Sequence, residues 1–187
     1  MSIILIVLIG LIVLLFVVGI TSYNKLIDLK NKTQEAHSDI DVQLKRRYDL
    51  IPNLVSTVKG SASFEQQTLE KVVQARQQAI DISGLSKEKA AAENQLSGAL
   101  RQLFALSENY PDLKSNQNYL HLQEELTNTE DRILASRRFY NQVVSDYNTV
   151  QDQFPPVLFK GFAGASKAEF FELENPQEER QNPKVQF

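Results

Sequence analysis

An unbroken apolar run at residues 3–20 constrains this chain more than any other feature. The run reads I-I-L-I-V-L-I-G-L-I-V-L-L-F-V-V-G-I and contains no charged or amide side chain. As an α-helix it extends about 27 Å, close to the thickness of the hydrocarbon core of a bilayer. The run therefore predicts a transmembrane helix, with the rest of the chain on one side of the membrane.

A cleavable signal peptide is the competing interpretation of this run. Such a peptide has a basic first segment, a shorter apolar stretch and a small-residue cleavage site. Only Met1 and Ser2 precede the run, and the sequence from Val18 to Ser22 matches such a site poorly. We therefore expect a retained anchor, and lipid attachment at a lipobox is excluded because the chain has no cysteine.

Lysines follow the run and none precedes it. Lys25, Lys30 and Lys32 come directly after the apolar residues. Because basic residues next to a membrane-spanning helix stay on the cytoplasmic side, we expect a short N-terminus outside and the following domain in the cytoplasm.

The composition of the remaining residues favours a single helical domain. About 165 residues suffice for one core. Seven glycines and no tryptophan do not favour a turn-rich β fold. The net charge of −3 and the pI near 5.5 provide no electrostatic surface for nucleic acid, so no nucleic-acid partner is expected.

The stretch after the anchor predicts one long helix. Apolar or small residues recur about every 3.5 positions from Leu26 to Val58, and no glycine or proline lies between Ile20 and Leu26. Pro52 predicts a kink, because proline removes a backbone hydrogen bond. At Gly60 the helix either continues or stops and reverses, and the periodicity leaves both open.

Two further helices are expected. The turn residues Ser83-Gly84 precede a second helix, for which Ser86 is the candidate N-cap and Pro111 the end. The third has apolar residues alternately three and four apart from Tyr119 to Phe154, which predicts a coiled-coil-like contact within a bundle or between chains.

The sequence changes in character after Phe154-Pro155-Pro156. A Phe-rich segment follows, then an acidic, amide-rich end that we expect to be disordered. The Phe-rich segment either packs onto the bundle or contacts lipid or a partner. The expected organisation is therefore an anchor at 1–22, a helical bundle at 23–156, and the Phe-rich segment with its acidic tail at 157–187.

Two motifs carry a family resemblance. Residues 38–55 read S-D-I-D-V-Q-L-K-R-R-Y-D-L-I-P-N-L-V, and residues 135–141 read A-S-R-R-F-Y-N, with Tyr147-Asn148 and Phe154-Pro155 following. Both resemble signature stretches of the LemA family of bacterial membrane proteins, and the resemblance extends from the anchor to about residue 173. It implies an all-α fold, a bromodomain-like antiparallel four-helix bundle behind one transmembrane helix in the bacterial inner membrane.

The resemblance has further implications for this chain. Four helices imply a reversal near Gly60, with residues 23–59 and 116–153 as the long pair. The last helix would then run back toward the bilayer, and four phenylalanines would lie near lipid or a partner: Phe159, Phe162, Phe170 and Phe171. The family has no settled activity; one branch is tied to intracellular membrane compartments, and members often accompany a membrane-bound zinc metalloprotease.

The charged residues of the two motifs form the candidate site. We expect them to connect the first and last helices, or to offer a surface to a partner protein: Asp39, Asp41, Arg46, Arg47, Asp49, Arg137 and Arg138. Arg47 falls between seam positions, so its burial requires a carboxylate such as Glu130 or Asp146.

Metal binding and catalysis are not favoured by these residues. His37 lies four residues before Asp41, but a di-iron bundle needs Glu-x-x-His on two helices, and His121 has only the reversed order with Glu124. Pairs within one helix, Asp41 with Lys45 and Arg46 with Asp49, are the simpler interpretation. The common zinc, phosphate, dinucleotide and serine-hydrolase motifs are absent from the sequence, and no catalytic residue, metal or cofactor is expected.

Three functions are compatible with this pattern. The favoured one is a non-enzymatic, membrane-anchored scaffold that self-assembles into a homo-oligomer or organises partners, and that shapes the membrane. The alternative, which rests on the family resemblance, is an adaptor for a membrane zinc metalloprotease in envelope stress or quality control. An enzyme or metal protein is the third.

Overall fold

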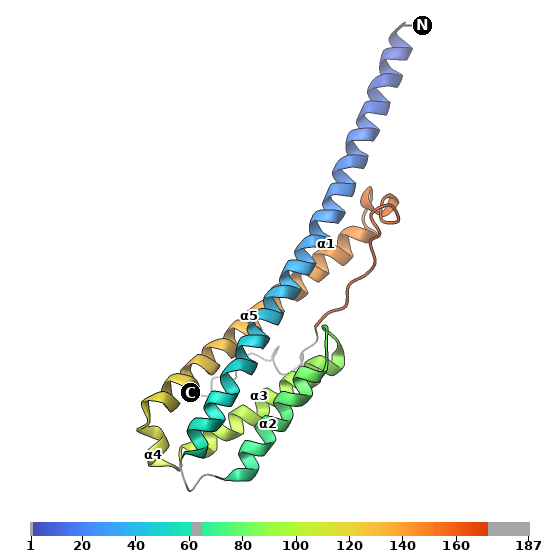
Figure 1. Ribbon diagram of the computed structural model, residues 1–187. Helices are drawn as coiled ribbons and strands as arrows, with labels where there is room; N and C mark the ends of the chain where they lie inside the picture. Colours follow the sequence, from blue (N-terminus) through green and yellow to red (C-terminus); the bar gives the residue numbers. More distant parts are fainter. Residues whose placement is uncertain (1, 61–64, 172–187) are drawn as a thin grey trace, which may run out of the picture. The chain divides into compact units, whose positions relative to one another are not determined.

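The computed structural model describes residues 2–60 and 65–171, and its regular elements are helical (Figure 1). The helices are α1 (Ser2–Lys59), α2 (Gln66–Asp81), α3 (Lys87–Ser107), α4 (Pro111–Lys114) and α5 (Gln117–Asp152), followed by a 3-10 turn at Pro156–Leu158. Among the described residues there is no strand, so the all-α prediction is confirmed. The acidic end that was expected to be disordered lies outside the described residues.

Two compact units make up the described chain. Unit 1 contains residues 2–38 and 138–170, and unit 2 contains residues 39–60, 65–137 and 171. Helices α1 and α5 each contribute to both units, because neither helix is interrupted at the boundary. The division expected at residues 22 and 156 stays a prediction.

Unit 2 is a bundle of four helical segments, taken from α1, α2, α3 and α5. Its core is built from the apolar faces of all four and closed by Leu113 of α4. The core residues from α1 are Ile51, Leu54, Val55 and Val58; those from the other long helices include Leu69, Val72, Leu96, Leu100, Leu103, Tyr119 and Leu126. Burial of each large aliphatic side chain contributes about 1.5–3 kcal/mol.

Successive helices of unit 2 are antiparallel. Arg76 Nε of α2 donates to the Tyr48 carbonyl of α1 at 2.8 Å. The two residues lie similarly far along the chain from the α1–α2 connection, as is expected when two successive helices are antiparallel. The Tyr119 hydroxyl donates to Ser107 Oγ at 2.5 Å near the α3–α5 connection. The chain therefore reverses after Gly60, as four helices require. Helix α1 includes Pro52, and the kink expected there stays a prediction.

Local sequence signals explain most helix ends. Ser86 caps α3 by accepting a hydrogen bond from Lys89 N at 3.2 Å, as expected, after a turn in which Gly84 has a φ of 78°. Asn116 caps α5 by accepting hydrogen bonds from two backbone N–H groups. Pro111 was expected only to end a helix. It instead begins α4, because proline fits the first turn of a helix, where no partner is needed for its nitrogen.

Unit 1 combines an uncovered helical stretch with a packed one. From Ile3 to Val17 the large apolar side chains are between 51% and 78% exposed. Further along α1, Leu26, Leu29 and Ala36 are buried, as are residues on the α5 side of this unit: Tyr140, Val143, Val144 and Tyr147. The His37 and Tyr140 rings meet edge to face, with centroids 6.4 Å apart. Within unit 1, the stretch of α1 that contains Leu26, Leu29 and Ala36 is therefore packed against protein.

Candidate functional site

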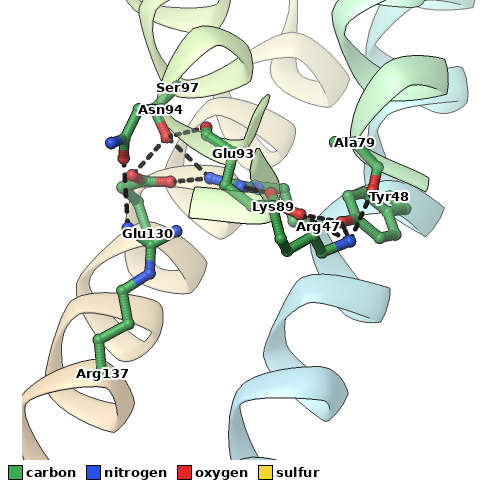
Figure 2. A network of polar contacts seen from close by, with 9 residues as sticks. All are labelled: Arg47, Tyr48, Ala79, Lys89, Glu93, Asn94, Ser97, Glu130 and Arg137. Atoms are coloured by element: carbon green, nitrogen blue, oxygen red, sulfur yellow. Dashed lines mark hydrogen bonds and ion pairs between the residues drawn. The ribbon is translucent and has the colours of Figure 1, made fainter. Parts of the chain in front are cut away.

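Arg47 is the centre of a polar network inside unit 2 (Figure 2). It lies between the seam positions Leu44 and Ile51 of α1, and its side chain has no exposed surface. Its guanidinium donates to Ser97 Oγ at 2.9 Å, to Glu130 Oε2 at 2.5 Å and to Glu93 Oε2. Glu130 is one of the two carboxylates expected as its partner, whereas Glu93 was not expected.

Glu93 connects Arg47 to a second group of polar side chains. Its other carboxylate oxygen accepts the Tyr48 hydroxyl hydrogen and lies 3.2 Å from Lys89 Nζ. Lys89 Nζ also donates to the Ala79 carbonyl at 2.6 Å. Burial, together with the hydrogen bond to Glu93 and its negative charge, raises the pKa of the Tyr48 hydroxyl well above its usual value. Tyr48 is therefore held as a neutral donor.

A third part of the network lies on the α5 side. The Ser97 hydroxyl donates to Glu130 Oε1 at 2.7 Å, and Arg137 donates to Asn94 Oδ1 at 3.3 Å. The Arg137 guanidinium lies over the Phe171 ring, 4.6 Å from its centroid, which is a cation–π contact. Burial, and then the nearby charge of Arg47, lower the pKa of Arg137.

The network contains an excess of positive charge. Arg47, Lys89 and Arg137 are cationic, whereas Glu93 and Glu130 are their only anionic partners within Figure 2. Among the described residues the Nε atoms of Arg47 and Arg137 have no hydrogen-bond partner. Because buried ion pairs barely offset their desolvation, such a network specifies which helix faces meet more than it adds stability.

The motif charges expected to act together are divided between this network and the surface. Arg47 and Arg137 are buried in the network. Arg46 instead pairs with Glu125 of α5 at 2.5 Å, and Asp49 pairs with Lys45 at 2.9 Å. The pair expected between Arg46 and Asp49 is thus wrong, because each has another partner. The pair of Asp41 with Lys45 stays a prediction. The side chains of the remaining motif charges are exposed: Asp39, Asp41 and Arg138.

Four residues of the network, all on α3, were not predicted from the sequence. Lys89, Glu93 and Ser97 are spaced four apart, on the helix face that also carries Leu96 and Leu100. That spacing is the available signal, since polar residues on an apolar face must find buried partners. Asn94 lies beside this face and is half-buried.

The second motif has a separate role in unit 1. Tyr140 donates to the Glu169 carbonyl at 3.0 Å, and Gln151 donates to the Ser166 carbonyl at 3.3 Å. The Asn148 amide donates to the Ala168 carbonyl and accepts from the Ala168 N–H, both at 2.9 Å. These side chains hold residues 166–169, named here the C-terminal strap, against α5.

The four phenylalanines expected near lipid or a partner have different surroundings. Phe162 is 84% exposed and Phe170 is also exposed, whereas Phe159 is half-buried and its ring approaches Gly19. Phe171 is fully buried beside Arg137. Its expected lipid contact is therefore wrong, because its ring is covered by protein.

No group of three or more His, Cys, Asp or Glu residues that could hold a metal ion occurs in the part of the chain that the structure describes. Figure 2 shows instead that the acidic side chains of the network point to basic ones. These ion pairs join side chains of α1, α3 and α5.

The fold and the network define a helical-bundle protein, and among the described residues one helix is long and apolar enough, by length and composition, to cross a membrane. A family model described as the LemA family matches residues 36–187. Protein LemA of Metamycoplasma hominis is 33% identical over 129 residues, which cover 67% of this chain and 58% of that protein. The chain belongs to the LemA family.

More distant relatives include magnetosome proteins. Magnetosome protein MamQ 2 of Paramagnetospirillum magneticum is 26% identical over 176 residues, and magnetosome protein MamQ of Magnetospirillum gryphiswaldense is 23% identical over 174. Each alignment covers 80% of this chain and 64% of the relative. The chain thus spans about three fifths of the length of these relatives and of protein LemA.

Proposed function

We propose that this protein is a non-enzymatic, single-pass membrane scaffold that assembles with copies of itself or holds partner proteins at a bilayer. The observation that carries the proposal is the uncovered stretch of α1 from Ile3 to Val17, whose large side chains are at least half exposed. Water is a poor solvent for so many adjacent apolar side chains, whereas the hydrocarbon core accepts them. The same helix continues to Lys59 and contributes to the core of unit 2.

The polar network supports a structural role over a catalytic one. Its carboxylates are engaged by guanidinium, ammonium, hydroxyl and phenol donors, so none is poised to accept a proton from a substrate. Because two relatives are named as magnetosome proteins, we extend the proposed function to the building of a membrane-bounded cell structure. In its strongest form, the proposal is that the protein shapes the bilayer.

The anchor itself can be tested with a matched pair of variants. Leu11 lies in the apolar run and Val42 lies in unit 2, and both are exposed apolar side chains on α1. Arginine at the centre of a membrane-spanning helix is unfavourable by about 3 kcal/mol or more. We expect the triple variant Leu8→Arg, Leu11→Arg and Leu14→Arg to shift the protein from the membrane pellet to the alkaline-washed supernatant, because three arginines outweigh the apolar residues of the run. Val42→Arg should stay in the pellet. Equal distributions of the two variants would exclude the anchor.

The proposed orientation places unit 2 in the cytoplasm of a bacterial cell, with the anchor in the plasma membrane. Lys25, Lys30 and Lys32 on one side of the run support it. The chain has no cysteine, so a single Cys is a clean reporter. In intact cells, Ser83→Cys in the exposed α2–α3 turn should resist a membrane-impermeant maleimide, and in lysed cells it should react. Labelling in intact cells would reverse the orientation.

Assembly is best tested by imaging. Full-length protein extracted in detergent, and then returned to vesicles, should give homo-oligomers by electron microscopy and native mass spectrometry. A monomer that co-purifies with a membrane zinc metalloprotease would instead favour the adaptor. A monomer without partners in both detergent and vesicles would contradict the scaffold.

A further inference from the structure

The chain after α5 turns back beside the end of the apolar run. A Cβ on Gly19 would lie 3.1 Å from Phe159 Cζ and 3.3 Å from Phe159 Cε1, so the ring packs directly on this glycine. Lys30 Nζ donates to the Gly164 carbonyl at 3.2 Å, which makes a second contact within unit 1. Gly19 is the last residue but one of the run. Residues 154–163, named here the apolar turn, therefore lie at the level where the run ends.

The apolar turn presents three large apolar side chains outward. Phe154 is 78% exposed, Leu158 61% and Phe162 84%. Backbone hydrogen bonds hold this arrangement, because Ala163 N donates to the Phe159 carbonyl at 3.0 Å and Phe159 N to the Pro156 carbonyl at 2.9 Å. The exposed side chains thus belong to an ordered turn.

We propose that the apolar turn is a second membrane contact, in which Phe154, Leu158 and Phe162 enter the interfacial region of the leaflet on the lysine side of the anchor. The position of Phe159 indicates lipid as the occupant, since its ring packs on Gly19 and the apolar run ends at Ile20. Exposed aromatic and aliphatic side chains are favourable at the boundary between headgroups and acyl chains, and Lys160 beside them can reach the headgroups.

This contact differs from the anchor in its effect on the bilayer. A membrane-spanning helix adds area to both leaflets, whereas side chains inserted at one interface add area to that leaflet alone. The inference rests on the proposed anchor. With the second contact, each chain takes up more area in the leaflet on the lysine side than in the other leaflet.

Single tryptophans test the contact, because the natural sequence has none. The full-length chain is reconstituted in vesicles whose lipids carry bromine near the headgroup end of the acyl chain, which quenches tryptophan at the interface. Phe162→Trp and Leu158→Trp report on the apolar turn, Phe16→Trp on the anchor, and Phe139→Trp on the body of unit 1. Phe139 is 53% exposed and adjoins Tyr140, which meets His37 about 25 Å beyond the end of the run.

We expect bromolipid to reduce the emission of Phe162→Trp and Leu158→Trp, and to leave the emission of Phe139→Trp unchanged. If Phe16→Trp is quenched, with bromine placed deeper in the chain, while both turn variants behave like Phe139→Trp, the second contact is excluded and the anchor stands. If Phe16→Trp is not quenched, the anchor and the proposed function fail together. The helical circular dichroism signal confirms that each variant has folded.

Discussion

Arg47 of α1 and Glu93 of α3 form an ion pair in which neither side chain has any exposed surface. The adjacent residue, Arg46, pairs with Glu125 at a much more exposed position. Two neighbouring arginines thus provide a buried and an exposed ion pair in the same bundle, and the two pairs should respond differently to loss of the carboxylate.

Glu93→Gln should destabilise unit 2 strongly. The change removes the charge that Arg47 and Lys89 share, and leaving buried charges uncompensated typically reduces the free energy of unfolding by about 3–5 kcal/mol. Glu125→Gln is the matched control and should have a much smaller effect, because water and salt already screen that pair. Denaturant unfolding of full-length protein in detergent, followed by circular dichroism, measures both. Equal losses for the two variants would show that Glu93 does not hold the network.

Tyr48 should make stability depend on alkaline pH. Burial first, and then Glu93, raise the pKa of its hydroxyl, so above pH 10 an unfolded tyrosine ionises while the folded one stays protonated. The contribution is therefore complete below about pH 10 and is lost as pH rises beyond it. Between pH 10 and 11 the free energy of unfolding should fall less in Tyr48→Phe than in the wild type. The difference should be below about 1.4 kcal/mol, since the ring is half-buried. Parallel curves for the two proteins would contradict this.

The helices can be predicted from the sequence because the signals for them are local. Ser86, Gly84 and the seam of α5 act within a few residues, and the helix ends follow from them. Arg47 was also recognisable, since a charge on an apolar seam demands a partner. Its partner Glu93 could not be identified from the sequence, because there it resembles an ordinary surface residue of an alanine-rich helix. Only the packing of four helices buries it.

Two other features of the structure could not be predicted from local sequence signals. The compact units share α1 and α5, and no break in either helix marks the boundary at residues 38 and 138. Phe171 and Phe162 belong to the same Phe-rich stretch, yet Phe162 is exposed, whereas Phe171 is buried with Arg137 over its ring. Contacts between distant residues decide such differences.

Asn148→Leu should release the C-terminal strap. The change keeps the branching of the side chain but removes both hydrogen bonds to the Ala168 backbone, each of which contributes about 1 kcal/mol. Hydrogen exchange at residues 166–169 and tryptic cleavage after Lys167 should both become faster. Thr149→Val, at the exposed neighbouring position, is the control and should leave both rates unchanged. Unchanged exchange in Asn148→Leu would mean that other contacts hold the strap.

Gly19→Leu should displace the apolar turn, because the new side chain would occupy the space of the Phe159 ring. Overpacking of this kind costs about 1–3 kcal/mol, which the turn can relieve by moving away from α1. Gly10→Leu is the matched control on the same apolar run, where a Cβ meets nothing within 4 Å. In detergent, trypsin should cut after Lys160 faster in Gly19→Leu than in the wild type, and Gly10→Leu should match the wild type. The same rate in all three proteins would show that Phe159 does not pack on Gly19, and the apolar turn would lose its fixed position at the end of the anchor.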